Sequence, residues 1–331
     1  MSDKQHPLVS LIIPCFNASG TIEECIGSCT RQEHTLLEII VVDDHSTDDS
    51  VTVAEALAKE DGRIRVFKNP KKGVASARNF GMKNARGVFI KFLDSDDFIS
   101  DNLISAQVGV LKNRTGAIAH CGWAHFIHEV GDLPSIHQAT DRNFVDSGRF
   151  LAELWQNNMY PVHAWLVPRQ LVSAELSWDE ALTQNGDGEF FARIISKAQG
   201  VFFSQGMAFY RRPQSGNVSQ QVGDMHMQSQ LSALRSYRNV CTELNDEPDL
   251  LNGFHSQVCA IAYRASTTLE EMDCLSELLS MLETEQHDQA FPTRVMNALA
   301  NVLGLKRAFF IRLFIARLGF GIGARKVKSS A

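Results

Sequence analysis

Residues 37–44 read LEIIVVDD and residues 88–97 read VFIKFLDSDD, so two apolar stretches each run directly into a cluster of aspartates. The apolar parts are typical of buried strands, and the aspartates stand where those strands are expected to end. Like charges held close together cost folding free energy unless a positive group offsets them. A divalent cation carrying a diphosphate would do so, because magnesium-type sites combine one or two carboxylates with substrate phosphates. Alternate residues of an extended strand point the same way, so we expect Asp94 and Asp96 to face one ligand.

The first part of the chain alternates between strand-like and helix-like segments. We expect strands at residues 8–13, 37–42, 63–67 and 88–93, and helices at residues 20–32, 46–59 and 74–85. This alternation predicts an α/β fold with a mostly parallel central sheet flanked by helices. Ligands of such sheets bind beyond the carboxyl ends of the strands, near the switch in strand order. Residues 14–17, 43–44 and 94–96 all fall at such ends, which predicts that they share one site.

The second part of the chain has a mixed pattern. We expect helices at residues 102–113 and 150–156, strands at 117–128 and 161–167, a helix opening near Gly188, and mostly helix from Met225 onward. A polar stretch at residues 216–223 is the expected boundary between a domain of residues 1–222 and a helical C-terminal region of residues 223–331.

Composition and charge exclude some classes of protein. The net charge of −6 over 331 residues does not favour nonspecific nucleic-acid binding. Seven cysteines without a CxxC spacing predict buried thiols in a reducing cytosol. The N-terminus has no signal-peptide core, and no apolar run is long enough to span a membrane. We therefore expect a cytoplasmic protein; its oligomeric state is left open.

The C-terminal tail is both basic and apolar. Residues 305–331 carry seven Lys and Arg and no acidic residue, so the rest of the chain carries −6 less 7, or −13. Residues 308–320 read AFFIRLFIARLGF. One hypothesis is that residues 305–328 make a peripheral contact with the anionic inner face of the cell membrane. The alternative is a helix packed on the catalytic domain with its arginines at the rim.

Four segments carry a family resemblance: VSLIIPCFN at residues 9–17, VVDDHSTD at 41–48, GVASARNFG at 73–81 and FLDSDD at 92–97. In this order they resemble the motifs of the inverting glycosyltransferase family 2, which has the GT-A fold of nucleotide-diphospho-sugar transferases; the last resembles its DxD motif. The resemblance covers residues 8–97 and weakens beyond them. It implies a nucleotide-sugar donor, which we expect to be a UDP-sugar, and a divalent metal cofactor, Mn²⁺ or Mg²⁺. Residues 1–97 would then form the nucleotide-sugar half and residues 98–222 the acceptor half.

The resemblance also implies which side chains bind the donor: Pro14, Asp44, Arg78, Asp94 and Asp96. Asp44 would recognise the base, Asp94 the ribose, and Asp96 would hold the metal on the diphosphate. Arg78 would reach the diphosphate or the base, since guanidinium pairs well with phosphate; alternatively, it forms a salt bridge with an aspartate cluster.

Two further aspartates have structural interpretations. Asp43 is either part of the site or a capping or buried hydrogen-bonded residue, and Asp97 is expected to be a loop or capping acid rather than a second ligand.

Residues 185–193, NGDGEFFAR, are the best match to the Glu-Asp pair that family members carry at the start of a helix under the acceptor. Gly186 stands at the Glu position, and Asp187 at the position of the catalytic base. Asp187 would also suit a helix N-cap, a role compatible with catalysis. Glu189 and Arg193 are four residues apart and are expected to pair. We therefore expect Glu189 to be structural and keep it only as the second candidate for the catalytic base. Because Gly186 carries no charge, it cannot raise the pKa of Asp187 as a carboxylate would.

Residues 210–219, YRRPQSGNVS, resemble a loop that closes over the donor, where Arg211 or Arg212 would neutralise the diphosphate or simply lie at the surface. His163 is expected to be a packed histidine, and no zinc-ligand spacing is present.

The function implied is transfer of a hexosyl or N-acetylhexosaminyl group, with inversion, from the donor to a hydroxyl of a polysaccharide or lipid-linked glycan. The alternative is a non-catalytic nucleotide-sugar-binding or assembly protein of glycan biosynthesis, for which Gly186 leaves room. A nicotinamide-dependent dehydrogenase is disfavoured because GxGxxG does not follow the first strand.

Overall fold

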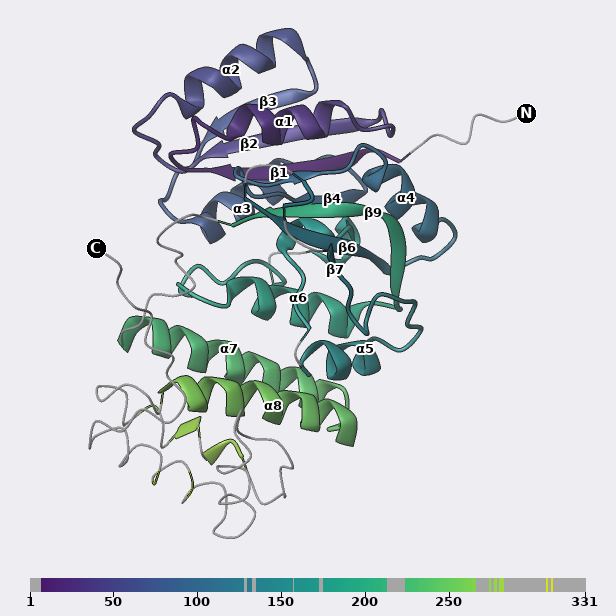
Figure 1. Ribbon diagram of the computed structural model, residues 1–331, viewed down its shortest axis with the longest axis vertical. Coiled ribbons are helices and arrows are strands. Elements are labelled where there is room, and N and C mark those ends of the chain that lie inside the picture. Colours follow the sequence, from purple (N-terminus) through teal and green to yellow (C-terminus); the bar gives the residue numbers. More distant parts are fainter. Residues whose placement is uncertain are drawn as a thin grey trace.

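Figure 1 shows a computed structural model of the chain. The structure describes residues 7–127, 130–132, 135–156, 158–172, 175–212 and 224–265, together with residues 274, 277, 278, 280–282, 308 and 311. The expected domain boundary at residues 216–223 lies outside this described part. The basic tail does too, except for Ala308, which is buried, and Ile311. Among the helices that the structure describes, none has the length and apolarity needed to cross a membrane.

The first sheet has the predicted parallel architecture. Its order is β3-β2-β1-β4-β8, and its strands are β1 (Val9–Cys15), β2 (Leu37–Asp43), β3 (Ile64–Lys68), β4 (Phe89–Phe92) and β8 (Val167–Pro168). The first four run parallel, and β8 pairs with β4 in the antiparallel sense. Every residue of β1 and β2 is buried, as expected for strands covered on both faces. The strand order switches between β1 and β4, so the carboxyl ends of these two strands face one crevice.

Three helices connect these strands: α1 (Ile22–Thr30), α2 (Ser50–Glu60) and α3 (Val74–Asn84). They confirm the predicted helices to within a few residues at each end. Helix α3 packs closely on β1 and β2. A Cβ on Gly81 would lie 2.3 Å from Cγ2 of Ile12, so only glycine permits this approach. This close packing fixes the position of α3 relative to the strand ends. It thereby fixes the position of Arg78, which lies on the second turn of the helix.

The second sheet has the order β5-β9-β6-β7 and consists of β5 (Phe98–Ile99), β9 (Val201–Arg211), β6 (Ile118–Phe126) and β7 (Ser135–Ile136). Helix α4 (Leu103–Leu111) packs on β6 and β9. The long strand β9 was not predicted, because its sequence VFFSQGMAFYR is interrupted by polar residues and by Gly206, which has a φ of 93°. The predicted strand at residues 161–167 was wrong. Three of its residues, Val162–Ala164, form a 3₁₀ turn closed by a hydrogen bond from Ala164 N to Pro161 O. Extended pairing is limited to Leu166, which bridges to Ala119, and to Val167 of β8.

Four helices form a layer beside the sheets: α5 (Ser147–Leu154), α6 (Gly186–Lys197), α7 (Asp224–Glu243) and α8 (Pro248–Ala265). A short 3₁₀ turn, Arg169–Leu171, follows β8. Helix α7 packs along α6, and α8 packs on both α5 and α7 (Figure 1). The helices expected near Gly188 and from Met225 onward are thus confirmed over the described residues. Helix α7 therefore contacts α6, the helix that carries the candidate base.

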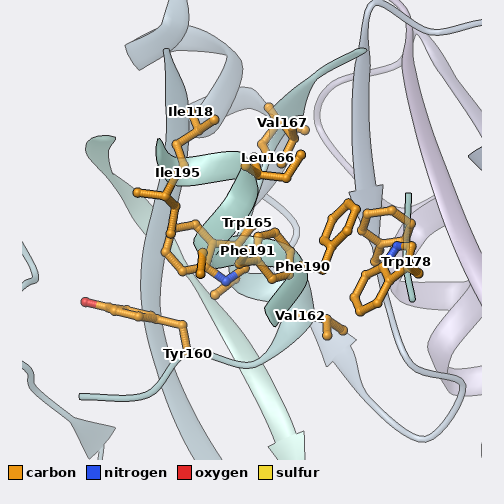
Figure 2. Packing of buried hydrophobic residues seen from close by; sticks show 14 of the residues in the cluster. Ile118, Tyr160, Val162, Trp165, Leu166, Val167, Trp178, Phe190, Phe191 and Ile195 are labelled. Atoms are coloured by element: carbon orange, nitrogen blue, oxygen red, sulfur yellow. The ribbon is translucent and has the colours of Figure 1, made fainter. Parts of the chain in front are cut away.

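An aromatic cluster joins the first sheet to α6 (Figure 2). The Trp178 ring stacks on Phe190 with ring centroids 4.2 Å apart, and Trp165 stacks on Phe191 at 5.1 Å. Phe92 of β4 meets both Trp178 and Phe190 edge-on. Buried aromatic pairs of this kind stabilise a core beyond their area of contact. All seven cysteines are free and buried, which confirms the prediction of packed thiols.

We expect the buried carboxylate of Glu38 on β2 to contribute strongly to stability. It accepts hydrogen bonds from Ser10 Oγ at 2.6 Å and from Gly87 N at 3.2 Å, and it pairs with Arg65 at 3.1 Å. Burial opposes its charge, but these bonds outweigh burial and lower the pKa of Glu38. Glu38→Gln should therefore destabilise the fold at pH 7 by about 2–4 kcal/mol, measured by urea unfolding.

The pH dependence gives this prediction a sign. Because the folded pKa lies below the unfolded value of about 4.3, the contribution is present above that pH and is lost as the pH falls through the folded pKa. The difference in free energy of unfolding between wild type and Glu38→Gln should accordingly become smaller in acid. The matched control is Glu55→Gln, which changes an exposed residue of α2. Equal destabilisation by the two substitutions would contradict the prediction.

Candidate active site

Three of the predicted segments meet at the carboxyl edge of the first sheet. Pro14 and Cys15 of β1 lie in register with Val42 and Asp43 of β2. Beyond the strand end, Asp44 N donates to Cys15 O at 2.7 Å. The acidic turn of residues 94–97 follows β4, which pairs with β1 on its other side. The structure therefore places these strand ends next to one another at one edge of the sheet, and that they form one binding site stays a prediction.

Asp44 fixes the start of α3. Its carboxylate accepts hydrogen bonds from Asn69 Nδ2 at 2.7 Å and from Gly73 N at 2.8 Å. Gly73 has a φ of 132°, in the region that favours glycine, and this conformation aims its N–H at the carboxylate. Asp43 is also buried, and its Oδ1 accepts from Ser46 N at 3.0 Å. For Asp43 the structure thus shows the buried hydrogen bond that was the structural alternative.

The residues after β4 form a turn rather than an extended strand, with a hydrogen bond from Asp97 N to Asp94 O at 3.1 Å. The expectation that strand alternation aligns Asp94 with Asp96 was therefore wrong, because β4 already ends at Phe92. The turn nevertheless gathers the acidic side chains at one place. Loss of hydration, followed by the negative charge of Asp94, raises the pKa of Asp96. The crowding of charge inferred from the sequence is thus present in the structure.

Asp97 has the structural character expected of it. It is buried, and its Oδ1 accepts from Arg211 N at 2.7 Å, while Oδ2 lies 3.4 Å from His163 Nδ1. Burial raises the pKa of Asp97 and lowers the pKa of His163 to about 3. His163 is fully buried, as predicted for a packed histidine. Burial therefore disfavours the charged form of both side chains in this part of the core.

Arg78 connects the two halves of the site. One guanidinium nitrogen lies 2.7 Å from Asp94 Oδ1 and the other 2.9 Å from Asp187 Oδ1. Its guanidinium carbon also lies 4.2 Å from the centroid of the Trp178 ring, and the side chain is only 6% exposed. The salt bridge weighed as an alternative for Arg78 is therefore real, and it is double. It brings a carboxylate after β4 and a carboxylate on α6 to the two terminal nitrogens of one guanidinium group.

Asp187 lies in the first turn of α6, with 52% of its side chain exposed. The helix begins at Gly186 after Asn185, so Asp187 does not occupy the N-cap position considered for it. Loss of hydration raises the pKa of Asp187; the charge of Arg78 opposes this rise, and the charge of Asp94 adds to it. Gly186 supplies no acidic neighbour to Asp187, but Asp94, which lies nearby in the folded chain, does.

The other charged residues singled out from the sequence are engaged in the fold. Glu189 pairs with Arg193 at 2.6 Å and accepts from Ser236 Oγ at 2.7 Å, which confirms the predicted pairing. Arg211 belongs to β9 rather than to a loop; it donates to Asp96 O at 2.8 Å and pairs with Glu24. Arg212 N donates to Phe126 O, and residues 213–219 of the expected loop lie beyond the described chain.

Two features of the site had no clear signal in the sequence. Phe16, directly after β1, is 48% exposed, and the Lys72 ammonium lies 5.2 Å from its ring centroid. A cavity of about 560 Å³ opens beside Arg78 and Asp187 and reaches as far as α7 and α8. Its walls come from segments far apart in the chain, so no local pattern could reveal it. The aromatic residue after a strand end could have been read as a surface for a flat ring.

The family model described as Glycosyl transferase family 2 matches residues 10–175, which is the half of the chain that carries the strand ends and the acidic turn. The chain belongs to glycosyl transferase family 2. The chain is similar to the uncharacterized glycosyltransferase EpsJ of Bacillus subtilis, with 31% identity over 244 residues, 70% of each chain. The GalNAc(5)-diNAcBac-PP-undecaprenol β-1,3-glucosyltransferase of Campylobacter jejuni is 39% identical over 121 residues, or 36% of this chain and 37% of that protein.

Solved structures confirm the predicted GT-A fold of this glycosyltransferase. The structure of S. aureus TarS residues 1–349 with UDP-GlcNAc superposes with a TM-score of 0.67 at 16% identity, covering 96% of this chain and 93% of that one. A mannosyltransferase of Pyrobaculum calidifontis, solved with GDP-Man and Mn²⁺, gives a TM-score of 0.53 at 15% identity, covering 96% and 88%. At these identities the likeness concerns the fold alone.

Proposed function

We propose that this chain transfers a sugar, with inversion, from a UDP-sugar to a hydroxyl of a polysaccharide or lipid-linked glycan. The observation that carries the proposal is that Arg78 pairs with both Asp94 and Asp187, which holds the candidate base next to the acidic turn and beside a cavity. Inverting transfer needs a donor site and a base on opposite sides of the reacting carbon. The UDP-GlcNAc in the TarS structure and the lipid-linked acceptor named for the Campylobacter relative support this choice of substrates.

On the donor side, we assign the nucleoside to the ends of β1 and β2. The exposed ring of Phe16 offers a flat surface for a base. The backbone of Asp44 bonds to Cys15, the residue before Phe16, so the carboxylate of Asp44 would accept a hydrogen bond from that base. Pro14 is buried at the floor of this position, at the end of β1. Asp94 would then contact the ribose, and Arg78 would meet the diphosphate from the opposite side of the turn.

The acidic turn fits a divalent cation. Among the described residues, no group of three or more His, Cys, Asp or Glu is arranged to hold a metal ion unaided. Mg²⁺ and Mn²⁺ sites of nucleotide enzymes need only one or two carboxylates, because substrate phosphates complete them. Asp96 is accessible from the surface, and its pKa is raised by loss of hydration and by the charge of Asp94, so a cation bound there would offset that repulsion. When bound there, Mn²⁺ or Mg²⁺ would supply positive charge to the leaving diphosphate.

The residues of the chain then divide the chemistry between them. Asp187 takes the proton of the acceptor hydroxyl, whose oxygen forms the new bond to the anomeric carbon. The bond from this carbon to the diphosphate breaks, and its electron pair leaves with the diphosphate. Because Arg78 holds Oδ1 of Asp187, we assign the proton to Oδ2. The raised pKa of Asp187 makes it a stronger base, and its ion pair fixes the direction of its approach.

A thermal-shift and product-release panel tests the proposal against its non-catalytic alternative. With a UDP-sugar and Mn²⁺, the unfolding temperature should rise, because a ligand at 100 times its Kd adds about 2.7 kcal/mol of stability. Slow release of UDP without acceptor should accompany the shift. A shift without any release would favour a binding or assembly protein, and neither effect with any UDP- or GDP-sugar and cation would overturn the proposal.

A further inference from the structure

The cavity beside Asp187 has the size and position of a binding site. Its volume is about 560 Å³, within the 300–1,000 Å³ that is usual for small-molecule sites. Its lining joins Arg78 and the half-exposed Asp187 to Gln230 and Tyr237 of α7 and to Gln257 and Ile261 of α8. A group lying in it would therefore present its near end to the candidate base.

The cavity walls are strongly aromatic. Tyr160, Trp165, Trp178 and Phe191, seen in Figure 2, line one side. Trp155, stacked on Tyr237 with ring centroids 4.9 Å apart, lines the other. Three of the four tryptophans of the chain thus face this one space. Aromatic rings offer apolar surface to a ligand without demanding a charge from it, and they suit the C–H faces of a sugar ring.

Carboxamides are the most numerous class of polar side chain in the cavity lining. Its lining includes the amides of Asn158, Gln184, Asn185, Gln230 and Gln257. Several are held in place, as in the bonds from Gln257 Nε2 to Trp155 O at 2.6 Å and from Gln230 Nε2 to Gln184 Oε1 at 3.2 Å. An amide can both donate and accept, so it suits a hydroxyl group, which does the same. Fixed amides between aromatic walls are therefore complementary to a polyhydroxylated ring.

The charge of the lining excludes an anionic ligand. Arg78 is the only cationic side chain among the described residues that line the cavity, and it is already paired with Asp94 and Asp187. The acidic side chains that line it are Asp179 and Asp187. A phosphate or carboxylate placed deep in the cavity would thus be desolvated without a cation to offset it.

From these contacts we propose that the cavity holds an uncharged sugar residue of the acceptor, and that α7 and α8 select that residue. The proposal rests on the proposed function, since it takes Asp187 of the cavity lining to be the base. The residues of α7 and α8 lie beyond the segment 10–175 that matches the family. The acceptor wall is thus built by a part of the chain that the family pattern does not define.

Tryptophan fluorescence of the full-length protein tests the proposal. The probes are the neutral methyl β-glycosides of glucose, galactose, GlcNAc and GalNAc, compared with methyl glucuronide and titrated in the presence of UDP and Mn²⁺. At least one neutral glycoside should change the fluorescence saturably, and methyl glucuronide should bind at least tenfold more weakly. No response to any neutral glycoside, or equal binding of the glucuronide, would overturn the proposal.

A matched pair of variants locates the effect on α8. Gln257→Glu places a carboxylate in the cavity, whereas Asn252→Asp makes the same chemical change at an exposed position of the same helix. Gln257→Glu should raise the Kd of the neutral glycoside at least tenfold and leave the Kd of UDP unchanged, and Asn252→Asp should change neither. Equal Kd values for the two variants would contradict the role of α8.

A second variant, Thr183→Phe, tests the same proposal in case Gln257→Glu does not fold. Thr183→Phe narrows the cavity from an exposed position at its rim and should weaken the glycoside in the same way, with the unfolding temperature as the check on folding. Unchanged glycoside binding in this variant would also count against the proposal. Failure of the proposed function looks different, because UDP and UDP-sugars would then not bind to the wild-type protein at all.

Discussion

Replacement of Asp187 by asparagine should lower kcat about 10²–10⁴-fold, the usual contribution of a general base. Asparagine keeps the shape of the side chain and an oxygen that can accept from Arg78, whose nitrogen lies 2.9 Å from Asp187 Oδ1. It cannot take the acceptor proton. Donor binding should therefore persist, and steady-state kinetics with saturating UDP-sugar should show the loss in kcat rather than in the KM for the donor.

The control for this prediction is Glu189→Gln on the same helix. Glu189 is buried and held by Arg193 and Ser236, so its loss should lower stability and leave the chemical step in place. If Glu189→Gln lost as much kcat as Asp187→Asn while remaining folded, the second candidate would be the actual base. Full activity in Asp187→Asn would refute the assignment directly.

The pH dependence of activity distinguishes a catalytic role of Asp187 from a purely structural one. A base acts in its deprotonated form, and desolvation together with Asp94 raises the pKa of Asp187. Activity should therefore fall as the pH drops through a value above the ordinary Asp pKa of about 3.9. Removing the charge of Asp94 by Asp94→Asn should shift this acidic limb to lower pH, and Asp187→Asn should abolish it.

The sequence predicted the first sheet well because its strands are continuous apolar runs and its helices end at recognisable stops. The rule that parallel strands present their ligands at their carboxyl ends then placed Asp44, Asp94 and Asp96 together. In the second sheet, the predicted strand at residues 117–128 is confirmed as β6, but the prediction missed β9 for a physical reason. Strand β9 is stabilised by its pairing with β6 and β5 rather than by its own pattern, and Gly206 breaks the apolar alternation.

The site itself was predictable only where its residues lie at strand ends. The ion pair between Arg78 and Asp187 joins residues 109 positions apart, so no spacing could indicate it. The contribution of Asp94 to the raised pKa of Asp187 was missed for the same reason. Asp94 is distant in the sequence, yet it supplies the nearby negative charge that Gly186 cannot supply. The cavity wall from α7 and α8 depends on how those helices pack, which patterning within each helix does not specify.

Asp96→Asn should remove the cation-dependent part of donor binding, with a loss of at least tenfold in affinity, or about 1.4 kcal/mol. The amide retains one neutral oxygen and loses the charge that a hard cation requires. Calorimetric titration of UDP with and without Mn²⁺ measures the effect: wild type should bind more tightly with the metal, and the variant should bind equally with and without it.

The same substitution should not lower the stability of the fold, because the negative charge of Asp96 is unfavourable in the folded state. Its folded pKa is raised by desolvation and by Asp94, so its charge opposes folding once the pH rises above the unfolded value. Without ligands, Asp96→Asn should therefore unfold at the same or a higher temperature at neutral pH, and the difference should vanish in acid. The control Asp101→Asn removes an exposed carboxylate paired with Arg31 at 3.6 Å, and it should leave metal-dependent binding intact. A destabilised Asp96→Asn protein that still binds UDP more tightly with Mn²⁺ would show that this carboxylate supports the fold rather than a cation.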